Sequence, residues 1–148
     1  MSLTPLLPHF LISAAHSDEG PRPREHGVVY LEEGRFAGWP ANHGAWSWGN
    51  EIVVGFRLGY YKAKPDGHPI DPDRPSVPRQ ARTLDGGRTW RIEVPSYLEE
   101  NGRERTPQNL PTTVDFSHPD FAARFSGGKF FYSYDRCRTW HGPFQLPD

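Results

Sequence analysis

Two octets of the same pattern carry the most distinctive chemistry in the sequence. Residues 83–90 read TLDGGRTW and residues 133–140 read SYDRCRTW, so both fit S/T-x-D-x-G-x-x-W, with Cys137 at the glycine position of the second. The two aspartates, Asp85 and Asp135, are 50 residues apart. An aspartate in a tight turn accepts hydrogen bonds from nearby backbone N–H groups. The pattern therefore predicts two equivalent structural turns rather than two catalytic carboxylates.

The other positions of the octets are also expected to build the turns. A Ser or Thr hydroxyl can satisfy a backbone group across the turn, and a glycine supplies the positive φ that such turns often need. The tryptophan returns to the sheet and packs its ring against the turn or a neighbouring sheet. We expect purely structural roles for Thr83, Asp85, Gly87, Trp90, Ser133, Asp135 and Trp140.

The residue types that most often bind metals or act as nucleophiles show no such arrangement. The seven histidines, at positions 9, 16, 26, 43, 68, 118 and 141, lack the spacing of a metal site. The single cysteine, Cys137, has no partner for an internal disulfide and no neighbouring His or Asp that would activate it. We predict no metal and no cofactor, and expect Cys137 to lie where the second turn tolerates a small residue.

Composition favours an all-β fold and excludes several kinds of partner. The 16 prolines and 15 glycines in 148 residues require many turns, which is typical of short strands. Aromatic residues make up 14% of the chain while all hydrophobic residues make up 35%, so the core must rely on aromatic rings. The net charge of −1, with scattered Lys and Arg, predicts no nucleic-acid partner. No segment is long enough to span a membrane, so no membrane partner is expected.

Short runs of β-branched and aromatic residues mark the expected strands. The strongest candidate is 51–61 (EIVVGFRLGYY), whereas the five prolines of 64–78 predict a loop and 34–50 lacks helical periodicity. One short turn of helix is expected near 97–101. Further strands are expected at 28–30, 79–84, 90–94, 112–116, 121–125, 129–134 and 139–145.

The first 26 residues are expected to form a lead-in. Residues 1–15 are mildly apolar and end in small residues, as in a signal peptide, which would make the protein secreted or periplasmic. Four features oppose that interpretation: Pro5, Pro8, His9 and the lack of a basic amino-terminal region. Without a signal peptide the expected location is cytoplasmic, so the sequence leaves the localisation open.

The octet resembles the Asp-box, or BNR repeat, of sialidases and related β-propellers, and the likeness runs from about residue 28 to 146. Residues 34–41 (GRFAGWPA) and 50–56 (NEIVVGF) resemble the start of the first blade in that family. The spacing of 50 residues suits a four-stranded blade. The resemblance implies a partial propeller of about two four-stranded blades, at about 27–95 and 112–147, where the complete family has six.

The resemblance also implies a sialidase-like glycoside hydrolase that acts on terminal sialic acid. In that family three arginines hold the substrate carboxylate, a Tyr–Glu pair is the nucleophile and a loop aspartate is the acid/base. Carried onto this sequence, Arg35 is the first carboxylate-binding arginine and Lys62 a second cation near the carboxylate. Asp71 or Asp73 would be the acid/base, with the choice open, and Asp115 would contact side groups of the substrate.

Other interpretations stand beside the enzyme. About two blades do not supply the whole family site, so hydrolysis would need further blades from a longer parent or from an oligomer formed through open sheet edges. The alternatives are a non-catalytic glycan- or protein-binding module and a truncated product without activity. Three tryptophans, Trp39, Trp46 and Trp48, could line a sugar pocket or pack in the core.

Overall fold

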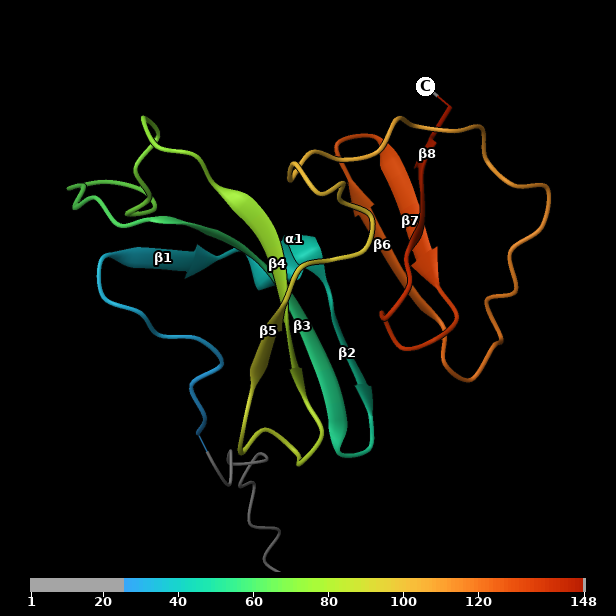
Figure 1. Ribbon diagram of the computed structural model, residues 1–148, viewed down its shortest axis with the longest axis horizontal. Helices are drawn as coiled ribbons and strands as arrows, with labels where there is room; N and C mark the ends of the chain where they lie inside the picture. The colour runs from blue at the N-terminus through green and yellow to red at the C-terminus, as the bar shows by residue number, and fades with distance from the viewer. Residues whose placement is uncertain (1–25, 148) are drawn as a thin grey trace, which may run out of the picture.

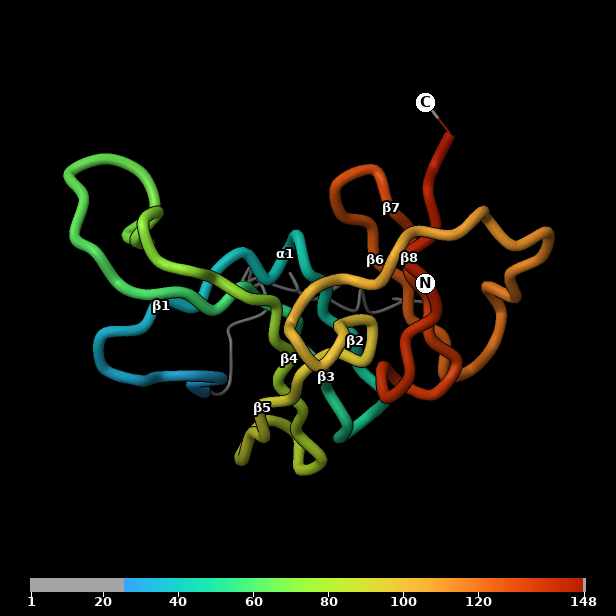
Figure 2. Tube along the Cα trace, turned by 45° about the horizontal axis from the view of Figure 1, so that its top comes forward, coloured from blue at the N-terminus to red at the C-terminus, as the bar shows by residue number. Residues whose placement is uncertain are grey.

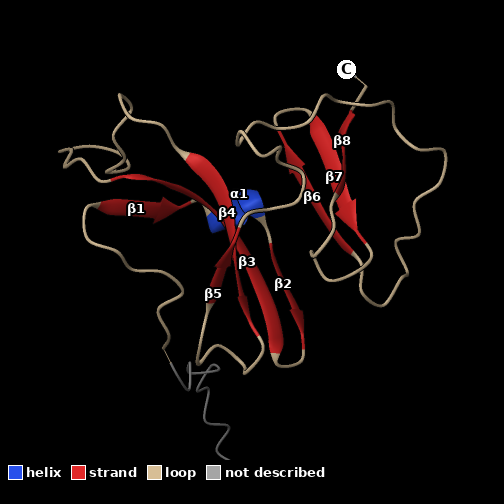
Figure 3. Ribbon diagram, in the orientation of Figure 1, coloured by secondary structure: helices blue, strands red, loops and turns tan. Residues whose placement is uncertain are grey.

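The computed structural model describes residues 26–147. Within this range the chain forms strands, turns and loops and a single short helix (Figure 3). The predicted all-β class is confirmed. The lead-in at 1–26 and the signal-peptide interpretation of 1–15 fall outside the described residues, apart from His26. No helix between residues 26 and 147 is long and apolar enough to cross a membrane.

The first sheet is an antiparallel arrangement centred on a long strand. Its strands are β1 (Arg35–Gly38), β2 (Ala45–Trp48), β3 (Glu51–Tyr60), β4 (Val77–Thr83) and β5 (Arg91–Glu93). Strand β3 pairs with β4, and β4 with β5. On its other side, β3 pairs with β1 at its carboxyl end and with β2 at its amino end. Strands β1 and β2 thus share one row, and the sheet has four rows.

The row shared by β1 and β2 is interrupted by the helical turn α1 (Pro40–His43), which packs on β3. The centre of β3 accommodates it because Gly55 has no side chain. A Cβ at Gly55 would lie 2.5 Å from the carbonyl oxygen of His43, which is too close for any other residue. The Gly55 N–H instead donates to the Gly44 carbonyl over 2.8 Å. The sequence 34–50 gave no periodic signal for this arrangement.

The second sheet has three antiparallel strands, β6 (Ala122–Ser126), β7 (Lys129–Ser133) and β8 (His141–Gln145), in the order β6-β7-β8. It lies beside the first sheet, and a long connection runs from β5 around it to reach β6 (Figure 1). The prediction of a further strand at 112–116, which would be the fourth of this sheet, is wrong, because this segment is irregular. There Asp115 closes a local turn through its Oδ1, which accepts the Ser117 N–H over 2.9 Å.

Two other local predictions are also wrong. Residues 28–30 form no strand, although Tyr30 covers Phe56 of the first sheet with ring centroids 5.6 Å apart. The helical turn expected near 97–101 is a pair of hydrogen-bonded turns instead. Tyr97 and Leu98 are buried there. Packing of their side chains, rather than helix propensity, determines this segment.

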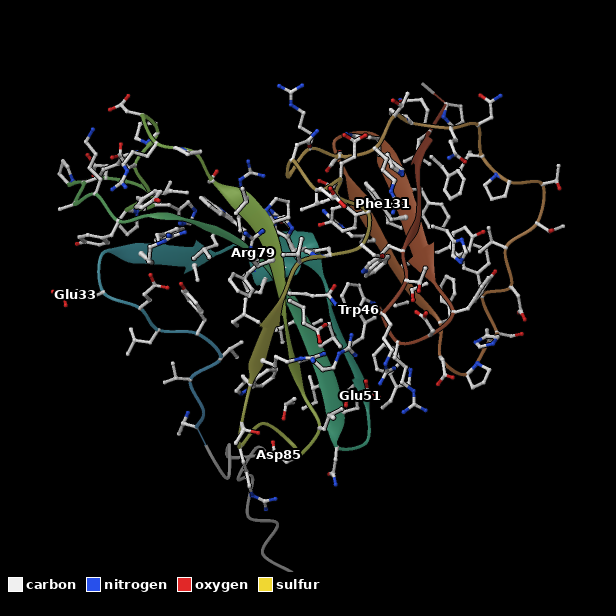
Figure 4. The ribbon with its side chains drawn as sticks, in the orientation of Figure 1. Glu33, Trp46, Glu51, Arg79, Asp85 and Phe131 are labelled. Atoms are coloured by element: carbon white, nitrogen blue, oxygen red, sulfur yellow. The ribbon has the colours of Figure 1, made fainter. Side chains whose placement is uncertain are left out.

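The main core lies between the facing sides of the two sheets. Strand alternation determines its members: Trp46 on β2 lies opposite Val53 on β3, and Arg124 on β6 lies opposite Phe131 on β7. The Trp46 and Trp140 rings meet with centroids 5.4 Å apart. Figure 4 shows Trp46 on the side of the first sheet that faces the second. The buried cluster comprises Val53, Tyr97, Leu98, Ala122, Phe131, Cys137 and Trp140.

The two octets form turns with matching hydrogen bonds, the first between β4 and β5 and the second between β7 and β8. Asp85 Oδ1 accepts the Thr89 N–H over 2.9 Å, and Asp135 Oδ1 accepts the Thr139 N–H over 2.7 Å. The hydroxyls of Thr83 and Ser133 donate to these carboxylates over 2.7 and 2.8 Å and accept the N–H of residues 87 and 137. The equivalent bonds give the two turns the same shape.

The tryptophans of the two octets differ in what they contact. Trp90 donates its indole N–H to the Gly87 carbonyl of its own turn over 3.0 Å. Trp140 donates instead to the Gln80 side chain on β4 of the other sheet, over 3.1 Å. The second turn is therefore docked against the first sheet, whereas the first turn, which contains Asp85, lies at the lower end of its own sheet, away from the second sheet (Figure 4).

Candidate functional site

Four of the five residues implied as site residues lie together at one end of the first sheet. We call this end the tip: the start of β1, the end of β3 and the loop 61–76. Figure 2 shows this loop, in green, projecting beyond β1. The loop is closed at its base because Lys62 N–H donates to the Pro69 carbonyl over 3.1 Å and Asp71 N–H to the Tyr60 carbonyl over 2.8 Å.

Arg35 is placed at the tip by its pairing with Tyr60, which lies opposite it in the β1–β3 ladder. Its Nε donates to the Gly59 carbonyl over 2.9 Å. The guanidinium lies over the Tyr60 ring, 4.3 Å from the centroid, and the guanidinium of Arg74 lies 3.2 Å from the same centroid. Both guanidiniums are thus held at the Tyr60 ring, because cation–π interaction attracts each of them to it.

Lys62 bridges the two loop aspartates. Its Nζ lies 2.7 Å from Asp73 Oδ2 and 3.4 Å from Asp71 Oδ1. Asp71 Oδ1 also accepts the Asp73 N–H over 3.1 Å. The Asp73 side chain is 76% exposed and that of Asp71 only 15%. Asp71 therefore serves to shape the loop, and Asp73 is the carboxylate that a ligand in solution can reach.

The contacts at the tip keep Asp71 and Lys62 charged. The hydrogen bond from the Asp73 N–H and the contact with Lys62 hold the pKa of Asp71 below its usual range. Hydrogen bonds to Asp73 and Asp71 raise the pKa of Lys62. Arg35, Lys62 and Arg74 oppose two carboxylates, which leaves one excess positive charge among these five side chains. Such a surface can attract a carboxylate, since an arginine can bind one with two parallel hydrogen bonds.

Asp115 lies away from the tip. It precedes β6 in the long connection around the second sheet, and this connection, drawn in orange, lies on the side of the molecule opposite the green loop in Figures 1 and 2. Its backbone N–H donates to the Tyr134 hydroxyl over 2.7 Å, and its carboxylate accepts bonds from Ser117. Asp115 thus stabilises a loop turn in this structure and does not meet the other four residues.

Of the three candidate tryptophans, only Trp39 is near the tip. It contacts the exposed His68 of the loop, with ring centroids 4.8 Å apart in an edge-on arrangement. Trp46 packs on Trp140 in the core, and Trp48 donates to the Pro119 carbonyl over 3.1 Å. Trp39 is therefore the ring that could stack on a sugar held at the tip.

Sequence reasoning missed two arginines that the structure makes prominent. Arg74 lies in the same proline-rich loop as Asp71 and Asp73, but no pattern connected it to Tyr60. Arg124 is buried between the sheets. The alternation of 122–126 (AARFS) could have placed Arg124 on the same face as Ala122. Among residues 26–147, no group of three or more His, Cys, Asp and Glu side chains gathers as a metal site would.

Comparison with family models, with curated proteins and with solved structures finds no match to this chain.

Proposed function

We propose that this chain is a two-repeat segment of a sialidase-like Asp-box β-propeller and that its tip binds the carboxylate of an acidic terminal sugar. Two repeats with equivalent octet turns support the propeller part of the proposal. The observation that carries the binding function is the clustering of Arg35, Lys62 and Arg74 at one end of a sheet. Trp39 and Tyr60 add aromatic surface beside these cations.

Binding is better supported than hydrolysis. A glycosidase acid must be protonated at working pH, which requires a raised pKa, whereas the pKa of Asp71 is lowered. Asp73 is the remaining candidate, because its exposed carboxylate can approach a glycosidic oxygen. Hydrolysis would further require a nucleophile opposite Asp73, and we therefore keep it as the second candidate function.

The binding function is tested by titrating the methyl α-glycoside of sialic acid into the ¹⁵N-labelled protein. We expect saturable shifts of the backbone amides of Arg35, Lys62 and Asp73. Loss of one charge-assisted contact costs about 1.5–3 kcal/mol, so Arg35→Ala should weaken binding roughly 10- to 100-fold. Arg103→Ala, which removes an exposed arginine from the loop after β5, is the matched control and should bind as the parent does.

Two results would contradict the binding function. One is the absence of saturable shifts at the tip, and the other is equal affinity for the methyl ester of the same sugar, which lacks the negative charge. Hydrolysis is tested separately with a fluorogenic sialoside. Release that Asp73→Asn reduces about 10²-fold or more would support the acid/base role, whereas release unaffected by Asp73→Asn would exclude it.

A further inference from the structure

A second cationic feature lies away from the tip, at Arg124. This residue is on β6 and is only 5% exposed, so its guanidinium is removed from solvent between the sheets. It lies over the rings of Tyr97 and Phe131, 4.7 and 4.9 Å from their centroids. Its Nε has no hydrogen-bond partner in the described part of the chain. A buried charged donor without a partner is energetically costly.

Arg124 forms no ion pair within residues 26–147. The nearby carboxylate of Glu104 is taken by Lys129. Arg124 Nη2 lies 3.5 Å from His43 Nδ1, and burial together with the charge of Arg124 lowers the pKa of His43 to about 4. At neutral pH His43 is therefore uncharged, and no carboxylate among the described residues compensates the positive charge of Arg124.

Arg124 borders a groove between α1 and the β6–β7 hairpin. The groove has a volume of about 520 Å³, which is large enough for a monosaccharide-sized molecule. One wall is formed by Asn42 and Gly44, and the other by residues 123–127. Asn42 and Ser126 provide hydrogen-bonding groups. The groove thus combines a buried positive charge with neutral polar groups.

We propose that this groove is a second anion-binding site, which takes a small carboxylate-bearing sugar with its carboxylate directed at the guanidinium of Arg124. A guanidinium can bind a carboxylate through two parallel hydrogen bonds. The wall residues hold the sugar ring. The site shares no residue with the tip, so it goes beyond the proposed function and stands or falls separately from it.

The test titrates glucuronate, and glucose as its uncharged counterpart, into the ¹⁵N-labelled protein. We expect saturable shifts of the Asn42, Gly44, Ser126 and Gly127 amides with glucuronate and none with glucose. Arg124→Gln should weaken binding at least tenfold. Because Arg124 is buried and this variant could misfold, Asn42→Asp supplies a second arm: it places a negative charge on the groove wall and should weaken binding about fivefold. Asn109→Asp makes the same charge change at an exposed site in the long connection and should leave affinity unchanged.

The proposal is overturned if glucuronate produces no saturable groove shifts, if glucose produces the same shifts, or if binding survives both Arg124→Gln and Asn42→Asp. Glucuronate shifts confined to residues 60–74 would also overturn it, while leaving the tip function standing. Conversely, the groove amides could shift with glucuronate in a protein whose tip does not bind the sialoside. That result would support the groove site and contradict only the proposed binding function of the tip.

Discussion

Glu51 on β3 and Arg82 on β4 form an ion pair of 2.7 Å between side chains that are only 9% and 4% exposed. The second octet turn adds two guanidinium groups to the same carboxylate, from Arg136 at 3.1 Å and Arg138 at 2.8 Å. Arg82 also donates to the Arg136 carbonyl over 2.8 Å. One carboxylate therefore joins the first sheet to the second repeat.

Glu51→Ala should lower the free energy of unfolding by about 2–4 kcal/mol, because three guanidiniums lose a shared acceptor and one of them, that of Arg82, is buried. Arg82 keeps its contact with Glu93 at 3.1 Å, which limits the loss. Urea denaturation measures the effect. Glu100→Ala removes an exposed loop carboxylate and is the control. Equal unfolding midpoints for Glu51→Ala and the control would show that Glu51 does not link the repeats.

Acid should destabilise the protein through the same residues. Burial of Glu51 opposes its ionisation, but hydrogen bonds from Arg136 and Arg82 outweigh it and lower its pKa. The pKa of Glu93 is lowered likewise against burial, by bonds from Arg82, Gln80 and Arg91. A lowered folded-state pKa contributes stability above the unfolded value, about 4.3 for Glu, and the contribution is lost as pH falls through the folded value.

We therefore expect urea midpoints to be flat near neutral pH and to fall with pH below about 4.3. Glu51→Gln, which cannot ionise, should show a shallower fall than the parent protein. If the two proteins lose stability in parallel, Glu51 is not among the groups that the acid titrates.

The two turn aspartates offer a matched comparison. Asp135→Ala should destabilise by about 1–3 kcal/mol, because the Thr139 N–H and the Ser133 hydroxyl lose their acceptor in a turn docked between the sheets. Asp85→Ala breaks the equivalent bonds and two more, from the Arg88 N–H and the Thr89 hydroxyl, but in a turn where water can replace the lost acceptor, so its effect should be smaller. Thermal melts of both variants rank them. A larger loss of stability for Asp85→Ala than for Asp135→Ala would contradict the conclusion that the second turn, and not the first, is docked between the sheets.

Cys137 combines two opposing properties. Its φ is 64°, in the left-handed region, where the matching Gly87 has 97°, yet its side chain is fully buried in the main core. Cys137→Gly relieves backbone strain of roughly 1–2 kcal/mol but loses packing of similar size. We expect it to remain within about 1 kcal/mol of the parent. Cys137→Ala loses the sulfur without relieving strain and should be the less stable of the two in urea denaturation.

The sequence predicted the parts of the fold that depend on local pattern. The run of 51–61 corresponds to β3, and the octets lie between strands, because strand preference and turn chemistry act over a few residues. The interrupted row of β1 and β2 was not predictable, since α1 is held by its contact with Gly55 rather than by helical periodicity. Tyr97 likewise owes its conformation to the core of the two sheets.

The candidate site shows the same division. Arg35, Lys62, Asp71 and Asp73 come together because β1 pairs with the end of β3 and the proline-rich loop returns to Tyr60. Only the resemblance to a family connected Arg35 with two loop aspartates that lie 36 and 38 residues later. Asp115 could not be placed from sequence, because its hydrogen bond to Tyr134 depends on how the long connection passes the second sheet.

Only the second octet turn docks on the other sheet, so the contact between the two repeats is asymmetric. Gln80 and Arg82 receive the second turn, whereas Phe130 and Tyr132, 50 residues later, lie on the side of β7 opposite the buried Phe131 and so away from the first sheet. The side of the first sheet that carries Gln80 and Arg82 and the equivalent side of the second sheet, with Phe130 and Tyr132, therefore point in the same direction instead of facing each other. A contact of this head-to-tail kind has no two-fold axis. Copies joined by repeating it can only advance in one rotational sense, ending in a closed ring or an open helix.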